Sequence, residues 1–472
     1  MGVLLLLFAT AVLPALAISA WYDDHELEHL VYVVAMSFGA GATLWWPLRH
    51  RKVQLRRQDG FIVVGLFWTC MSIVSALPFL YKPHLDLPSA VFEAVSAITT
   101  TGATVILGLD QLPPSILFWR QELQWLGGIG VIVSAVAIVP LLGIGGMQLY
   151  RAEAPGPVKD DKLSPRIVHT ARLLWTIYAG LTAACALAYW LAGMTVFDAI
   201  THSFSTLSTG GFSTHDASLA YFDSVAIEVI ASIFMLAGSL NFSVHFIALS
   251  SASPAAYWRN VEVRTFLLVV AALIGFVTAV LTLQGTYASV LLALRFASLQ
   301  VISIITSTGF ATADFSTWPL MLPALLIFSS FIGGCAGSTA GGMKVIRFVL
   351  LARQGLCDIR RLVHPKMQCA VVLSGRPVPE RVMGAVWGFF ALYMITFAVI
   401  MLILMADGMD QVTAFGAVAT CLNNLGPGLG EVASNFASVN DLARVVLSIA
   451  MLLGRLEIYT LLVLLSPAFW RR

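Results

Sequence analysis

Long apolar stretches separated by short polar loops recur along the whole chain. Ten of them are long enough to cross a bilayer, since a spanning helix needs roughly 20 apolar residues. They lie near residues 3–20, 30–48, 60–80, 117–148, 168–192, 224–250, 265–285, 319–350, 382–405 and 442–467. The pattern predicts an all-α polytopic membrane protein with ten transmembrane helices.

Four shorter apolar stretches lie between the longer ones, near residues 89–101, 196–209, 288–308 and 411–424. Because they hold only about 12 to 20 residues, they suit re-entrant segments better than full spans. Each runs into a polar segment built around a glycine, namely Gly102, Gly210, Gly309 or Gly426, and these glycines are 108, 99 and 117 residues apart. The spacing predicts four re-entrant loops in matching positions, each with a span before it and a span after it.

This arrangement predicts a pseudo-fourfold organisation that follows two extra spans. We expect the extra N-terminal spans in 1–50 and the repeats in 51–150, 151–258, 259–360 and 361–472, with a glycine-rich loop at 333–344 inside the third repeat. The N-terminal stretch is interpreted as a retained span and not a signal peptide, because Met1 and Gly2 provide no positive charge ahead of it.

Composition supports the membrane assignment. The 472 residues are 58% hydrophobic and only 11% charged, whereas an average soluble domain is about 45–50% apolar and about 25% charged. Soluble enzymes, nucleic-acid-binding proteins and disordered proteins are therefore excluded. The net charge of +2 implies no partner by itself.

The distribution of charge predicts the orientation. If ten spans alternate, 22 of the 27 Lys and Arg residues fall on one side, which the positive-inside rule assigns to the cytoplasm together with both termini. The loops of the other side are acidic. They are either ordinary solvated surface or a negative outer mouth that concentrates cations.

The four Gly-centred segments suggest an ion pathway. Non-helical backbone at membrane depth is tolerated only where it is buried in protein or lines a water-filled path. Four such loops around one axis could present rings of carbonyl oxygens that replace the hydration shell of a cation, and the negative C-terminal ends of the short helices would favour it. Ser, Thr and Gly also pack helices closely in membranes, but four matching segments favour the pathway.

Three motifs resemble the Trk/Ktr/HKT superfamily of potassium transporters, and most closely its TrkH branch. They are the Thr-Thr-Gly-Ala-Thr run at 100–104, the Asn-Asn-Leu-Gly-Pro-Gly-Leu-Gly run at 423–430 and the Gly-rich run at 333–344. The resemblance covers essentially the whole chain, and it implies a single chain that mimics a tetrameric potassium channel. It also implies potassium uptake across a bacterial inner membrane, a homodimer, and a cytosolic nucleotide-binding regulatory subunit of the Trk type.

The resemblance further implies a selectivity filter of backbone carbonyls with potassium as the substrate and no cofactor. The filter residues are then Thr100, Thr101, Gly102, Ser208, Thr209, Gly210, Ser307, Thr308, Gly309, Asn424, Leu425 and Gly426. Some relatives with Ser at the first of the four glycines favour sodium, so Gly102 implies potassium. The fourth segment departs from Ser and Thr, which backbone ligation tolerates.

The run from Gly333 to Gly342 interrupts the eighth span, and Gly and Ser make up six of the twelve residues through Lys344. It is either a kinked, tightly packed helix or a broken helix whose loop crosses the pathway below the filter. A phosphate loop is excluded because no Gly-Lys-Ser/Thr follows. The resemblance implies an intramembrane gate formed by Gly333, Gly334, Gly337, Ser338, Thr339, Gly341, Gly342, Lys344 and Arg455.

Arg455 lies deep in the last predicted span, where a charge is costly and needs a partner. It either pairs with Glu457 or Glu228, or, as the resemblance implies, binds the gate loop and places positive charge on the pathway. Asn241 and His245 in the sixth span are expected to bond neighbouring backbone, and the glycines in 127–130 are expected to allow close helix packing.

Two alternatives stay open. A sodium-selective or non-selective cation pathway would use the same architecture. An intramembrane zinc protease is the alternative from another class, because residues His25 to His29 match His-Glu-x-x-His; the motif lies in a short acidic loop without an obvious third ligand, so we expect no enzyme.

The six cysteines form no Cys-x-x-Cys pair and are expected to be small buried thiols. Channel-like transport and coupling to protons or sodium, as in a symporter, are not distinguished, although no chain of buried acidic or His residues suggests a proton relay.

Overall fold

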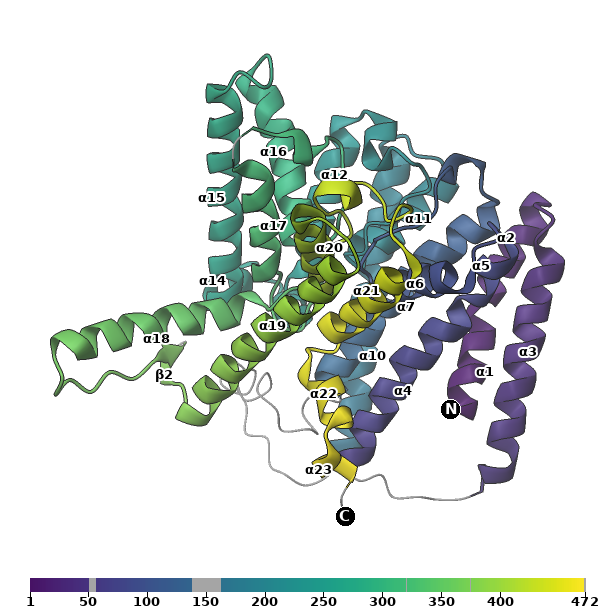
Figure 1. The fold of residues 1–472 in the computed structure, drawn as a ribbon, viewed down its shortest axis with the longest axis horizontal. Helices are drawn as coiled ribbons and strands as arrows, with labels where there is room; N and C mark the ends of the chain where they lie inside the picture. The colour runs from purple at the N-terminus through teal and green to yellow at the C-terminus, as the bar shows by residue number, and fades with distance from the viewer. Residues whose placement is uncertain (51–56, 138–162, 320, 374, 471–472) are drawn as a thin grey trace.

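The computed structural model describes residues 1–50, 57–137, 163–319, 321–373 and 375–470. The described chain is helical apart from one antiparallel hairpin of β1 (Val372–Leu373) and β2 (Arg376–Pro377). Figure 1 shows α1 to α3 at one edge of the molecule, α15 and the projecting α18 at the other, and α6, α11 and α20 between them. The N-terminus, the C-terminus and α18 lie toward the lower side of that view.

The N-terminal part forms two hairpin-like helices on the edge of the fold. It comprises α1 (Gly2–Ala11), α2 (Leu13–Tyr22), α3 (Leu27–Trp45) and the 3-10 turn η1 (Trp46–Leu48). Many of its large apolar side chains are exposed, including Trp21, Tyr32 and Phe38. An apolar surface of this extent suits lipid and not water.

Four successive sets of helices follow, and each contains a short buried helix between longer ones. The first set is α4 (Arg57–Ser75), α5 (Leu77–Tyr81), α6 (Leu87–Ile98), η2 (Leu109–Gln111) and α7 (Pro114–Ala137). The second is α10 (Leu163–Leu191), α11 (Val196–Leu207), η3 (Ser218–Phe222), α12 (Val225–Ser239), α13 (Phe242–Ser250) and α14 (Ala255–Arg259).

The third set is α15 (Val261–Leu283), α16 (Val290–Ile305), η4 (Phe315–Thr317), α17 (Leu322–Ile332) and α18 (Val345–Val363). The fourth, which follows the hairpin, is α19 (Glu380–Ala406), α20 (Gln411–Asn423), η5 (Gly430–Val432), α21 (Asp441–Arg455), α22 (Tyr459–Leu465) and α23 (Pro467–Trp470). The predicted re-entrant segments are therefore the short helices α6, α11, α16 and α20.

Six of the ten predicted spans are long and apolar enough to cross a membrane in the described residues. They are 2–22, 27–45, 60–81, 171–191, 261–283 and 380–406. A seventh, α12 with α13, passes only as a broken pair that is bent by 99°. The remaining predicted spans correspond to α7, which carries buried polar and charged side chains, and to the broken pairs α17–α18 and α21–α22. The end of the predicted span 117–148 lies outside the described residues.

Local sequence explains where the short helices begin and end. The side chains of Thr195, Ser289 and Asp410 accept hydrogen bonds from backbone amides in the first turns of α11, α16 and α20, as helix N-caps commonly do. At its other end each short helix stops at a residue with positive φ. The C-terminal halves of the short helices are almost completely buried, which is the condition under which a helix can end inside a membrane protein.

One prediction about the cysteines is wrong. Cys357 of α18 and Cys369 of the following segment form a disulfide with Cα atoms 5.7 Å apart, a separation typical of such bonds. Cys185, Cys335 and Cys421 are buried free thiols as expected, while Cys70 is only half-buried. The spacing of the bonded pair offered no motif, and the two residues are brought together by the turn between His364 and Met367 that follows α18.

Candidate functional site

The four segments that follow the short helices share one backbone conformation. Thr100, Thr209, Ser307 and Asn424 have φ angles of 53°, 53°, 53° and 54°. The amide of the next residue then donates a hydrogen bond to the carbonyl five residues earlier, over 2.8 to 2.9 Å in all four cases. These bonds satisfy carbonyls that a helix C-terminus leaves unpaired. The fourfold correspondence therefore rests on geometry as well as on sequence.

This geometry corrects the register of the second repeat. We call these four residues, whose φ is near 53°, the left-handed residues. In three repeats the glycine two residues further on also has a positive φ, and it is Gly102, Gly309 or Gly426. In the second repeat the glycine at that position is Gly211. Aligning Gly210 with the other glycines was therefore wrong by one residue. Ser208 is the residue just before the left-handed residue Thr209, and Gly211 is the counterpart of Gly102, Gly309 and Gly426. Two adjacent glycines fit either register, so the sequence alone did not separate them.

We call residues 100–102, 209–211, 307–309 and 424–426 the Gly segments. Each positive-φ glycine packs against a backbone carbonyl of another segment. A Cβ atom on Gly102 would lie less than 3.0 Å from the Gly210 oxygen, one on Gly211 from the Thr308 oxygen, one on Gly309 from the Leu425 oxygen and one on Gly426 from the Thr101 oxygen. The contacts run from first to second, third, fourth and back to first, so the Gly segments form a closed ring in chain order.

The chemistry of this ring is that of backbone oxygens. The side chains of Thr101 and Thr308 are engaged with the neighbouring Thr99 and Thr306, at 2.8 and 2.7 Å between hydroxyl oxygens. No hydrogen bond to the carbonyl of Thr101, Thr308 or Leu425 is found in the described parts of the chain. A ring with free carbonyls, closely approached by glycines, can coordinate a dehydrated monovalent cation.

Helix α7 supports the second Gly segment with two buried amide side chains. Gln124 donates from Nε2 to the Gly210 oxygen at 2.7 Å and accepts from the Phe212 amide at 3.1 Å. Gln121 donates to the Phe212 oxygen at 3.2 Å. Sequence reasoning missed both residues, although polar residues in an otherwise apolar predicted span were a visible signal.

A fully buried ion pair lies beside them. Arg120 of α7 and Glu93 of α6 approach within 2.8 Å, and both side chains are completely buried. Glu93 also accepts from the Val105 amide at 2.9 Å, and Arg120 donates to the Ser213 oxygen at 3.3 Å. The pair thus links the chain just after the first Gly segment to the chain just after the second.

Replacing Arg120 by Met is expected to lower the free energy of unfolding by about 3–5 kcal/mol, because it leaves the Glu93 carboxylate buried without its partner. Thermal unfolding of the purified protein in detergent measures the effect. Arg361→Met is the matched control, since Arg361 and Asp358 form an exposed pair that is worth about 0–1 kcal/mol. Equal destabilisation by the two variants would contradict the assigned role.

His215 joins the loops that follow the first two Gly segments. Its Nδ1 lies 2.5 Å from a carboxylate oxygen of Asp110, its Nε2 lies 3.6 Å from Asp198, and its ring stacks on Tyr221. Burial acts to lower the pKa of His215, but the hydrogen bonds to Asp198 and Asp110 raise it overall. The bond from His215 holds the pKa of Asp110 below its usual value. Some of the acidic residues that the sequence predicts for the outer side, such as Asp110, therefore hold loops together and are not merely solvated.

The glycine loop (residues 333–344) lies against the ends of three short helices. The Gly341 amide donates to the Ser307 hydroxyl at 2.5 Å, the Gly342 amide to the Asn423 oxygen at 3.1 Å, and the Thr339 hydroxyl to the Leu207 oxygen at 3.0 Å. A Cβ on Gly341 would collide with the Asn423 carbonyl. The run is therefore a break between α17 and α18, and it lies next to the ring of Gly segments.

Arg455, the last residue of α21, contacts this loop. Its Nη1 donates to the Thr339 oxygen at 2.8 Å, while its Nε and Nη2 have no hydrogen-bond partner among the described residues. Pairing with Glu457 or Glu228 is not what the structure shows, because those carboxylates bind Arg347 and Arg295. Lys344 has φ of 77° and its ammonium group donates to the Ala340 oxygen, so it is turned back onto the glycine loop.

Three further expectations can be compared with the structure. His245 contacts the Ala237 oxygen at 2.8 Å, and the Asn241 side chain accepts from the Ser243 amide at 2.9 Å, so both bond neighbouring backbone as predicted. A Cβ on Gly127 would meet the Ile98 carbonyl, which confirms close packing there. The His-Glu-x-x-His motif is not on one helix, because His25 has φ of 64° and precedes α3. No group of three potential metal ligands is present in the described residues.

Comparison with known proteins gives a consistent result. The family model TrkH, described as a cation transport protein, matches residues 28–472. The Trk system potassium uptake protein TrkH of Vibrio parahaemolyticus is 53% identical over 474 residues, covering 100% of this chain and 98% of that protein. The Escherichia coli K12 protein of the same name is 51% identical over 473 residues with the same coverage. The crystal structure of the potassium transporter TrkH from Vibrio parahaemolyticus matches with a TM-score of 0.93 and 50% identity, covering 100% of this chain and 98% of that one.

Proposed function

Because the chain belongs to the TrkH family of cation transport proteins, we propose that potassium crosses the membrane through the ring of Gly segments. The protein is a multi-pass membrane protein and a potassium transporter, not an enzyme. The observation that carries the proposed route is the closed ring, in which each positive-φ glycine packs against a carbonyl of the next segment.

The proposed filter uses backbone oxygens of Thr100 to Gly102, Thr209 to Gly211, Ser307 to Gly309 and Asn424 to Gly426. These oxygens replace part of the water around potassium, and the fixed backbone at the left-handed residues holds them in place. The C-terminal ends of α6, α11, α16 and α20 add their negative partial charge on the same side. Ser208 is left out of this set because it lies one residue too early.

The glycine loop and Arg455 form the proposed gate. The loop contacts the ends of α11, α16 and α20, and Arg455 is bound to it through the Thr339 oxygen. A buried guanidinium with two unbonded nitrogens next to a cation route repels potassium electrostatically. Movement of the loop, with Arg455 attached, would open the route.

The remaining parts of the proposal concern organisation. We propose the four repeats 51–150, 151–258, 259–360 and 361–472 after the extra spans of 1–50, with the basic loops and both termini in the cytoplasm of a bacterial inner membrane. A homodimer and a cytosolic nucleotide-binding subunit complete the proposed assembly. The basic residues of 344–381 offer that subunit a docking surface.

Flux measurements on the purified protein in liposomes test the proposal. We expect rubidium and potassium uptake to exceed sodium uptake, because the ring is lined by four rigid glycine-based segments and Gly102 is present. A proton gradient of either sign is expected to leave potassium flux unchanged at fixed voltage. Equal sodium and potassium flux would favour the non-selective alternative, and flux that follows the proton gradient would favour a symporter.

A further inference from the structure

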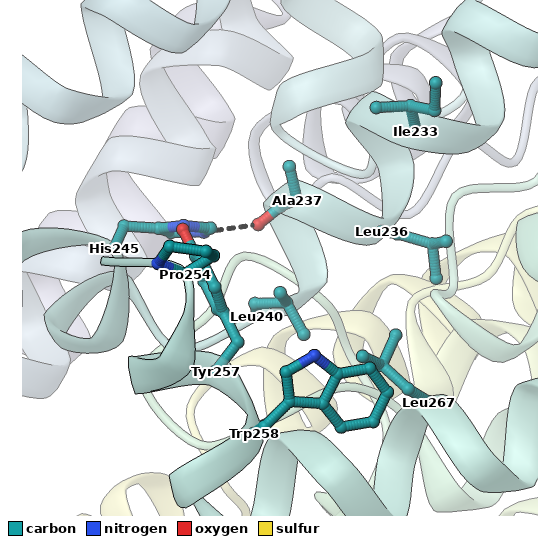
Figure 2. Close-up of a pocket in the computed structure, with 9 residues that line it drawn as sticks. All are labelled: Ile233, Leu236, Ala237, Leu240, His245, Pro254, Tyr257, Trp258 and Leu267. Carbon is teal, nitrogen blue, oxygen red and sulfur yellow. Dashed lines mark hydrogen bonds between the residues drawn. The ribbon is translucent and has the colours of Figure 1, made fainter. Parts of the chain in front are cut away.

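An apolar pocket lies where the sixth predicted span is broken. It has a volume of about 330 Å³ and is lined by residues of α12, α13, α14 and α15, together with Leu240 and Pro254 between them. Figure 2 shows Trp258 and Leu267 on one side of the pocket, His245 and Tyr257 on the other, and Leu240 between them. The volume falls at the lower end of the range of about 300–1,000 Å³ that small-molecule sites occupy.

The pocket opens to the outside of the fold. Ile233 is 57% exposed and Trp258 is 60% exposed. Because both are apolar and exposed on a multi-pass membrane protein, we expect the material that fills the opening to be hydrocarbon. The indole of Trp258 is of the kind that prefers the boundary between acyl chains and headgroups.

Two exposed arginines lie close in sequence to residues that line the pocket. Arg259 follows Trp258 directly, and Arg264 lies one helical turn before Leu267 on the same face of α15. Both arginines are exposed, and neither forms an ion pair with another described residue. In the proposed orientation they lie on the cytoplasmic side, where basic sites between helices bind anionic headgroups.

The imidazole of His245 and the hydroxyl of Tyr257 in the pocket wall are both bonded to protein. The Ala237 carbonyl can only accept, so His245 donates from Nε2, and its Nδ1 accepts from the Tyr257 hydroxyl at 2.8 Å. The dashed line in Figure 2 marks the first of these bonds. The pocket interior is therefore suited to an acyl chain and offers little to a polar ligand.

We propose that this pocket binds an anionic phospholipid, with one acyl chain among Ile233, Leu240 and Leu267 and its phosphate at Arg259 and Arg264. The site would act on the gate, because its wall continues into the backbone that holds the glycine loop. The Gly238 oxygen accepts from the Thr339 amide at 3.2 Å and from its hydroxyl at 2.9 Å, and the Ser239 oxygen accepts from the Cys335 amide at 2.9 Å. Thr339 is also the residue that binds Arg455. The expected effect of the bound lipid on ion flux rests on the proposed gate, whereas binding of the lipid to the pocket does not.

Fluorescence quenching tests the binding. The protein is reconstituted in phosphatidylcholine vesicles to which phosphatidylglycerol with brominated acyl chains is added, and Trp258→Phe identifies the contribution of Trp258. We expect the Trp258 signal to be quenched at a lower fraction of brominated phosphatidylglycerol than of brominated phosphatidylcholine. The double variant Arg259→Gln/Arg264→Gln should weaken apparent binding about 30-fold, since each basic residue near an anionic surface is worth about fivefold.

Arg360→Gln/Lys366→Gln is the matched control, because it removes the same charge from exposed residues outside the pocket and should leave quenching unchanged. Equal quenching by the two brominated lipids, or equal loss in both double variants, would overturn the site and indicate ordinary surrounding lipid. A second variant, Leu267→Phe, narrows the pocket without changing charge or adding a fluorescent indole, and should also reduce the preference.

Rubidium flux in the same vesicles tests the connection to the gate. We expect the ratio of flux with phosphatidylglycerol to flux without it to differ from one in the native protein, and to return to one in Arg259→Gln/Arg264→Gln. A native ratio of one alongside selective quenching would refute the connection to the gate while leaving the site. Absence of flux in every lipid would instead count against the proposed route.

Discussion

Gly211→Ala is expected to reduce potassium flux at least tenfold, to about a tenth of the native value or less. The residue has φ of 76°, and a Cβ there would collide with the backbone carbonyl of Thr308, which cannot move without displacing the third Gly segment. The positive φ alone costs an L-residue about 1–2 kcal/mol. Reconstituted protein assayed for rubidium uptake and for the ratio of potassium to sodium measures the result.

Gly193→Ala separates backbone strain from the effect on the ring. Gly193 also has a positive φ, of 105°, but nothing lies within 4 Å of the position of its Cβ. The Gly193→Ala variant should therefore be somewhat less stable than the native protein but transport potassium at the native rate. Gly210→Ala then tests the register, because Gly210 is not at positive φ and the atoms nearest to its Cβ would be those at the end of the Gln124 side chain, not a backbone carbonyl. If Gly210→Ala were more damaging than Gly211→Ala, the corrected register would be wrong.

Arg455→Ala is expected to raise cation leak through the closed protein about tenfold, which corresponds to about 1.4 kcal/mol in the barrier. The substitution removes the positive charge beside the route and the bond from Nη1 to the Thr339 oxygen that holds the glycine loop. Arg455→Lys keeps the charge but not the planar group, so it should leak less than Arg455→Ala. Flux in liposomes at equal protein density measures both variants.

Arg444→Ala provides the control for Arg455→Ala on the same helix. Arg444 lies in the first turns of α21, near the opposite end, and its partner Asp441 is 65% exposed. Its removal should leave leak at the native level. An unchanged leak in Arg455→Ala, with the protein correctly folded, would show that the guanidinium does not restrict ion passage.

The sequence was most informative where physical constraints act on single residues. Apolar length identified the long helices, and the recurring Ser, Thr and Gly after short apolar stretches located α6, α11, α16 and α20 within a few residues of their bounds. The glycine loop was recognisable because Gly and Ser cannot sustain a helix over 333–344. The sequence also identified Arg455 as a buried charge, since a charge at that depth is rare.

What could not be predicted depends on contacts between distant parts of the chain. The choice between Gly210 and Gly211 is made by the carbonyl of Thr308, almost a hundred residues away. The buried pair of Glu93 and Arg120 and the bond from Gln124 to Gly210 require knowing that α6 and α7 lie against the second Gly segment. Likewise, the 99° bend between α12 and α13 divides a stretch that was apolar enough to be one straight span.

Because a single chain supplies all four Gly segments of the ring, the sequence of each segment can change without a change in the other three. In an assembly of four identical subunits any substitution would appear four times, and most would be intolerable. Here the left-handed position holds Thr, Thr, Ser and Asn, and a glutamine amide binds the carbonyl in one quarter only among the described residues. An ion on the proposed route would therefore meet a nearly symmetric main chain in asymmetric surroundings, so a change in one Gly segment alone would alter its passage.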